Sequence, residues 1–70
     1  PNPANDLITI ATHTSDVSML IISDITGRKT IQSQEVNDGQ TISVKNLQPG
    51  MYLTTIINSK GSFTGKLMVK

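Results

Sequence analysis

Histidine and carboxylate side chains are the groups of this chain that could act as acids, bases or metal ligands. The 70-residue sequence holds a single histidine, His13, whose neighbours Thr12, Thr14 and Ser15 supply no second ligand at metal-binding spacing. We therefore expect His13 to be a loop histidine, and we expect no metal site. The carboxylates of the chain are Asp6, Asp16, Asp24, Glu35 and Asp38.

These carboxylates lie in or beside expected turns, where short acceptors commonly bind backbone N–H groups. An acid–base pair would need two of them in one cleft, which a domain of this size seldom forms. The calcium-loop pattern, the G-x-S-x-G motif and the phosphate-binding loops are missing from the sequence. Cysteine is also absent, which removes disulfides, thiolate zinc sites and cysteine nucleophiles. The sequence thus predicts no enzyme activity and no cofactor.

The composition excludes two further classes of partner. Six basic and five acidic residues are spread along the chain for a net charge of +1, so no basic stripe for nucleic acid forms. The longest apolar run, residues 19–22, is far shorter than the roughly 20 residues that span a bilayer, so we expect no membrane insertion. One tyrosine and one phenylalanine do not make the aromatic platform on which many modules stack sugars.

The chain is long enough for one domain, and its hydrophobic pattern has the period of two that is typical of strands. The segment 18–24 is apolar on both faces in its middle, which indicates a strand covered from both sides or paired centrally. The segment 29–36 is polar and predicts an edge strand. The expected strands are residues 7–11, 18–24, 29–36, 41–44, 51–58 and 63–69, the last interrupted by Gly65. Six short strands predict an all-β sandwich or small barrel.

Glycine and proline mark the turns between these strands. Gly27 fits the positive-φ position of a bulged hairpin, and the segment 37–39, Asn-Asp-Gly, is the strongest hairpin signal in the chain. Pro49 and Gly50 fit a type II turn. We expect the ring of Tyr52 to be buried and its hydroxyl to bond to the backbone. The faces of segment 51–58 divide into Tyr52, Thr54 and Ile56 on one side, and Met51, Leu53, Thr55 and Ile57 on the other.

Four motifs in this order resemble the C-terminal sorting domain of type IX secretion cargo proteins of the Bacteroidetes. They are Pro1-Asn2-Pro3-Ala4, Ile22-x-Asp24-x-x-Gly27-Arg28, Leu47-x-x-Gly50-x-Tyr52 and Gly61 followed by Lys66-Leu67-Met68-Val69-Lys70. Ser23 and Thr54 depart from that family's larger apolar or aromatic residues. The motif residues to which we assign structural roles are Asp24, Gly27, Gly39, Pro49, Gly50, Tyr52 and Gly61.

The resemblance implies an immunoglobulin-like β-sandwich of six to seven mainly antiparallel strands over residues 1–70, acting as a non-catalytic secretion signal. In such systems a folded cargo, joined to the N-terminus of the domain, passes from the periplasm through an outer-membrane translocon. A sortase-like cell-surface peptidase commonly removes the domain, and the cargo reaches the cell surface or the medium. Since the chain starts at Pro1 rather than methionine, we expect it to be excised from a larger secreted protein.

We expect the terminal strand, residues 63–69, to offer backbone groups to a receptor strand, with Lys66 and Lys70 setting the charge register. In the alternative, Leu67 and Val69 complete the core and the lysines keep an edge soluble. We also expect residues 1–3 to form a rigid lead-in to the first strand, with a second role in presenting the upstream linker to the peptidase. The expected sorting residues are Pro1, Asn2, Pro3, Lys66, Leu67, Met68, Val69 and Lys70.

Two other functions compete with a sorting signal. One is an accessory adhesive or carbohydrate-binding β-sandwich module of a secreted enzyme, which exposed aromatic residues or a calcium loop would favour. The other is a small hydrolase, for which the sequence offers almost no candidate catalytic residues.

Overall fold

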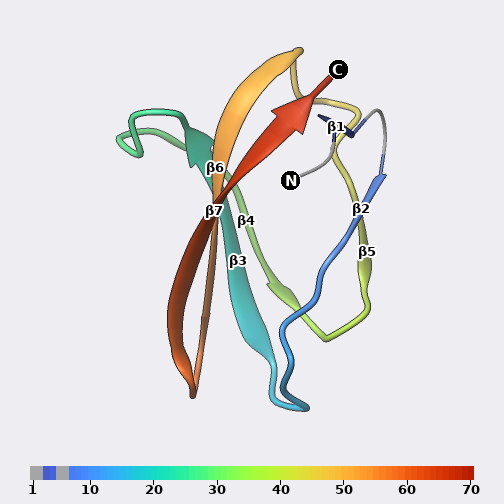
Figure 1. Cartoon of the computed structure of the whole chain (residues 1–70), viewed down its shortest axis with the longest axis vertical. Helices are drawn as coiled ribbons and strands as arrows, with labels where there is room; N and C mark the ends of the chain where they lie inside the picture. The colour runs from blue at the N-terminus through green and yellow to red at the C-terminus, as the bar shows by residue number, and fades with distance from the viewer. Residues whose placement is uncertain (1–2, 5–6) are drawn as a thin grey trace.

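The computed structural model describes residues 3–4 and 7–70 and folds them into two facing β-sheets (Figure 1). Its strands are β1 (Pro3–Ala4), β2 (Leu7–Thr9), β3 (Ser18–Asp24), β4 (Thr30–Val36), β5 (Thr41–Ser43), β6 (Gly50–Asn58) and β7 (Gly61–Val69). One sheet has the order β1-β7-β6-β3-β4, and the other pairs β2 with β5. The predicted all-β sandwich of mainly antiparallel strands is confirmed. The described residues include no helix that is long and apolar enough to cross a membrane.

The larger sheet is built around two long antiparallel pairings. Strands β6 and β7 stay in register over nine residues and are joined by a two-residue loop, Ser59 and Lys60. Strand β3 pairs with β6 on one side and with β4 on the other. The central position expected for segment 18–24 and the edge position expected for segment 29–36 are both confirmed.

The core lies between the two sheets and contains side chains from both. In the larger sheet these side chains alternate with outward-facing ones, as the pleat of a strand requires. The smaller sheet contributes only three residues a strand, so it covers part of the facing surface, and Phe63 on β7 is left 55% exposed. The buried apolar residues are Ile10, Leu20, Ile22, Val36, Ile42, Val44, Leu67 and Val69.

The segment 37–39 turns the chain from one sheet to the other, so the hairpin predicted there is wrong. The turn itself forms, with the N–H of Gln40 donating to the carbonyl of Asn37 at 3.1 Å. However, the N–H of Gly39 donates to the carbonyl of Ile10 at 2.7 Å, and the N–H of Ile10 donates to the carbonyl of Gln40 at 2.8 Å. These long-range bonds attach β5 to β2 instead of to β4.

Two further expectations about glycines are wrong, and one is confirmed. Gly50 has a φ of 153°, far from the value near 80° that a type II turn needs, and it opens β6 as the partner of Val69. Strand β7 continues through Gly65, which pairs with Thr54. Gly27 has the predicted positive φ, 76°, and its N–H donates to the carbonyl of Asp24 at 2.9 Å.

Candidate recognition site

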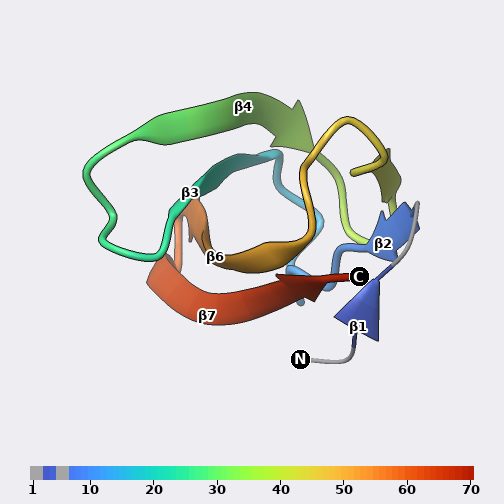
Figure 2. The ribbon, with the colours of Figure 1, turned by 90° about the horizontal axis from the view of Figure 1, so that it is seen from above.

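The two ends of the described chain lie side by side. Strand β1 runs parallel to the end of β7, with Pro3 opposite Met68 and Ala4 opposite Val69. Figure 2 shows β1 next to the tip of β7 and the C-terminus. The structure therefore brings together Pro3 and the C-terminal part of the expected sorting set. Pro1 and Asn2 lie outside the described residues.

The side chains of this C-terminal segment divide between the core and the solvent. Leu67 and Val69 are 5% and 3% exposed, because they pair with β6 on the inner face of the sheet. Lys66 and Lys70 are exposed, and Met68 is 40% exposed. A protein that binds the folded domain therefore reaches Lys66, Met68 and Lys70 without contacting the two core side chains.

The backbone along the outer edge of β7 is open for most of its length. Strand β6 pairs with the inner edge of all nine residues, whereas β1 pairs only with Met68 and Val69 on the outer edge. Along residues 61–67, no strand of the described chain occupies that outer edge. Unpaired strand edges present the donors and acceptors that another chain can use to add a strand.

The turn between β3 and β4 is organised by Asp24. Its carboxylate accepts hydrogen bonds from the Thr26 hydroxyl at 2.7 Å and from the Arg28 N–H at 3.2 Å. The Thr26 hydroxyl, followed by backbone N–H groups of the turn, lowers the pKa of Asp24 below 3.8. This motif residue thus acts as an acceptor that closes a turn, as expected for the carboxylates beside turns.

Asp38 fixes a second loop over a long sequence distance. Its carboxylate accepts a hydrogen bond from the Thr12 N–H at 2.8 Å and one from the His13 N–H at 3.4 Å. The Thr12 N–H is the main cause of the lowered pKa of Asp38. His13 adopts a left-handed backbone conformation, φ 58°, and its side chain is exposed in the loop. Glu35, in contrast, lies within β4, one residue before the strand ends at Val36.

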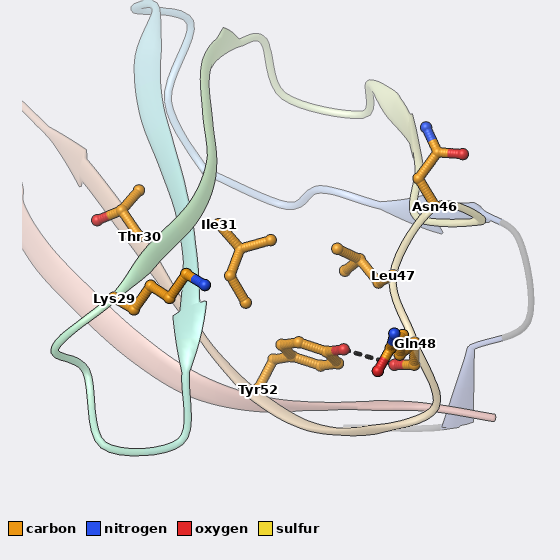
Figure 3. Close-up of a pocket in the computed structure, with 7 residues that line it drawn as sticks. All are labelled: Lys29, Thr30, Ile31, Asn46, Leu47, Gln48 and Tyr52. Atoms are coloured by element: carbon orange, nitrogen blue, oxygen red, sulfur yellow. Dashed lines mark hydrogen bonds between the residues drawn. The ribbon is translucent and has the colours of Figure 1, made fainter.

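A pocket of about 420 Å³ lies at one end of the sandwich, beside the Leu47-x-x-Gly50-x-Tyr52 motif (Figure 3). The side chains of Ile31, Leu47 and Tyr52 face one another across it. The Tyr52 hydroxyl donates to the backbone carbonyl of Gln48, as predicted, whereas the ring, predicted to be buried, is half-buried and packs against the edge of the core. This bond ties the segment before β6 to the start of that strand.

A family model for the secretion system C-terminal sorting domain matches residues 1–70 of this chain. The chain belongs to that family. As a type IX sorting domain it serves as a signal for secretion to the cell surface or extracellular space and interacts with the type IX machinery. No curated protein and no solved structure matches the chain significantly.

Two carboxylates of the sorting domain, Asp24 and Asp38, serve as hydrogen-bond acceptors in turns. Sorting domains of this family are in general non-catalytic. Within residues 3–4 and 7–70, no three histidine, cysteine, aspartate or glutamate side chains come together as metal ligands. Asp24 and Asp38 each bind the backbone of a turn, and the Tyr52 pocket contains no carboxylate or imidazole.

Sequence reasoning missed two features of the sorting domain. The pairing of Pro3 and Ala4 with β7 was missed because two residues carry no periodicity and the partner lies at the other end of the chain. The bonds from Asp38 to Thr12 and His13 were missed because an Asn-Asp-Gly segment predicts a local turn.

Proposed function

We propose that this sorting domain directs a folded cargo, joined to its N-terminus, from the periplasm through the outer-membrane translocon of the type IX system. The translocon recognises a rim, which we define as β1, the open edge of β7 and the exposed side chains of Lys66, Met68 and Lys70. A sortase-like cell-surface peptidase then removes the domain. The adhesive or carbohydrate-binding alternative gains no specific support, since Tyr52 is engaged with Gln48 and Phe63 lies four residues farther along the sheet.

The observation that carries this proposal is the pairing of β1 with β7. It joins the segment that follows the cargo to the last residues of the signal, so both are presented on one rim. A receptor that contacts this rim is also next to the connection to the cargo. Recognition and cleavage can therefore take place at neighbouring positions without unfolding the domain.

Strand addition is the mode of binding that this rim favours. Residues 61–67 leave about 23 Å of strand edge open, and main-chain hydrogen bonds along such an edge supply affinity. Specificity then depends on the side chains that the edge presents. Lys66 and Lys70 are exposed cations, and charges at the border of an interface mainly set the association rate and the register.

The test is a fluorescent passenger with a signal peptide, fused ahead of residues 1–70 and expressed in a host that has a type IX system. The passenger should leave the cell, and in an otherwise identical host without the translocon it should stay in the periplasm. A passenger without the domain is the negative control. Equal retention in both hosts would refute the proposal.

Deletion of residues 67–70 is a poor version of this test. It removes Leu67 and Val69 from the core, so lost export would follow from unfolding alone. Substitutions of exposed rim residues, with the melting temperature measured in parallel, separate recognition from folding.

A further inference from the structure

The outer face of the larger sheet, which points away from β2 and β5, carries an apolar patch. The patch comprises Met19, Ile21, Met51, Leu53, Ile57 and Met68. Met19, Met51, Ile57 and Met68 are 38–43% exposed, and all three methionines of the chain belong to this patch. Small hydroxyl residues fill much of the space between them, such as Thr55 and Thr64, whose Oγ1 atoms lie 3.2 Å apart.

The apolar character of β3 on both faces fits its central place in the sheet, and it also leaves apolar side chains on this outer face. Residues 19–22 are apolar on both sides of β3, yet the smaller sheet covers only the inner side, where Leu20 and Ile22 are fully buried. The patch lies on three strands, and together with β4 these strands define a face of about 400 Å² over seven residue positions, hydroxyl side chains included. The largest apolar patch on a typical monomer is about 300–600 Å², and such a patch is often functional.

Two charged residues of β3, β4, β6 and β7 share this face, and they lie at opposite corners of it. Lys66 on β7 pairs with Leu53, whereas Glu35 on β4 pairs with Met19 at the other end of the patch. The two positions are separated by three strand spacings, about 14 Å, and by four residues along the strands, about 13 Å. The diagonal that joins them therefore runs at about 45° to the strands.

We propose that a second copy of this domain covers the face. The larger sheets of the two copies then face each other. A two-fold axis that lies between them, perpendicular to the diagonal from Lys66 to Glu35, superposes the Lys66 position of each copy on the Glu35 position of the other. The patch is then self-complementary, with two ion pairs bordering an apolar centre, as an interface between identical copies requires. The strands of one copy's larger sheet cross those of the other copy's larger sheet at about 90°, which is one of the two preferred arrangements of packed sheets.

The size of the patch sets the strength of this association. Two copies bury about 800 Å² in total, less than the roughly 1,200 Å² at which stable complexes begin. The dimer is therefore weak and reversible, with a dissociation constant in the micromolar to millimolar range. Methionine side chains suit such a surface, because they adapt to neighbours at little cost.

Sedimentation equilibrium of the 70-residue chain, from about 10 μM to about 1 mM, tests the proposal. We expect a reversible monomer–dimer equilibrium. E35K and K66E should each weaken it by about tenfold or more, because each turns two attractions into two repulsions. An equimolar mixture of E35K and K66E should recover wild-type association, since both contacts between positions 35 and 66 of the mixed dimer then join opposite charges.

A matched pair of isoleucine variants tests the apolar centre. Ile57→Thr, on the patch, should weaken association by about tenfold, whereas Ile31→Thr should leave it unchanged, because Ile31 is equally exposed but lines the Tyr52 pocket. Circular dichroism of both variants is the control for folding. A wild-type chain that is monomeric at every concentration overturns the proposal, as does a dimer that the charge variants and I57T leave unaffected. The proposal is also overturned if the wild-type chain is monomeric and secretion is lost with I57T but not with I31T, because the patch then binds the secretion machinery.

Discussion

Pro3 and Met68 are register partners in the parallel pairing of β1 with β7. The pairing places the start of the described chain against its last strand, although the partners are 65 positions apart in sequence. The other edge of β7 is paired with β6 along its whole length, and the inward-facing side chains of β7 lie in the core. The rim is therefore fixed in place while its outward-facing side chains stay accessible.

The alternation of side chains along the end of β7 predicts that neighbouring substitutions differ sharply in effect. Leu67→Ala leaves a cavity in the core and should cost about 2–5 kcal/mol of unfolding free energy. Met68→Ala, at a 40% exposed position, should cost less than about 1 kcal/mol. Urea denaturation measures both values. Equal costs for the two variants would contradict the observed register.

Glycines 39 and 65 should respond to alanine with opposite signs. Gly39 has a φ of 83° and open space where a Cβ would lie, so Gly39→Ala should cost about 1 kcal/mol from the backbone alone. Gly65 has ordinary strand geometry and its Cβ would meet the Thr54 Oγ1 at 3.9 Å, so Gly65→Ala should gain about 0.5–1 kcal/mol. Thermal unfolding compares the two variants, and a stabilised G39A would be inconsistent with the turn described.

The hydroxyl of Tyr52 should stabilise the domain through its bond to Gln48. Tyr52→Phe retains the ring and removes that hydrogen bond, which should cost about 0.5–1.5 kcal/mol. For a domain of this size, 1 kcal/mol corresponds to a fall in Tm of about 4–8 °C. An unchanged Tm would show that the bond adds nothing to the packing of the ring.

The carboxylates in the turns predict a loss of stability in acid. The folded-state pKa values of Asp24 and Asp38 lie below the ordinary 3.8, so the folded protein releases these protons more readily than the unfolded chain. Their contribution is full well above pH 3.8 and is lost as the pH falls through the lowered values. Tm should therefore decline below about pH 4, and less steeply in Asp38→Asn. Glu35→Gln, within β4, is the control for removing a carboxylate elsewhere in the domain. A decline of Tm in D38N identical to that of the wild type would count against the role of Asp38.

The strands were predictable from the sequence because period-two patterning and turn residues are local signals. They correctly assign the two faces of segment 51–58 and the central position of β3. The pairing of β5 was not predictable from its turn, because the N–H of Gly39 is bound by Ile10, 29 residues earlier. Partners distant in sequence decide which sheet a short strand joins.

The candidate site was predictable only in part, for the same reason. The C-terminal residues were identified as a set, and alternation along a strand accounts for the division between buried Leu67 and Val69 and exposed Lys66 and Met68. Their apposition to Pro3 depends on a two-residue strand that no pattern indicates.

The most direct test of the account is the export of a fluorescent passenger fused to a domain in which Lys66 and Lys70 are both replaced by glutamine. The matched control replaces Lys29 and Lys45, which are exposed elsewhere in the domain. With equal melting temperatures, the K66Q/K70Q fusion should accumulate in the periplasm while the K29Q/K45Q fusion is secreted like the wild type. Full secretion of K66Q/K70Q, or equal loss with both pairs, would contradict recognition through the rim of β1 and β7.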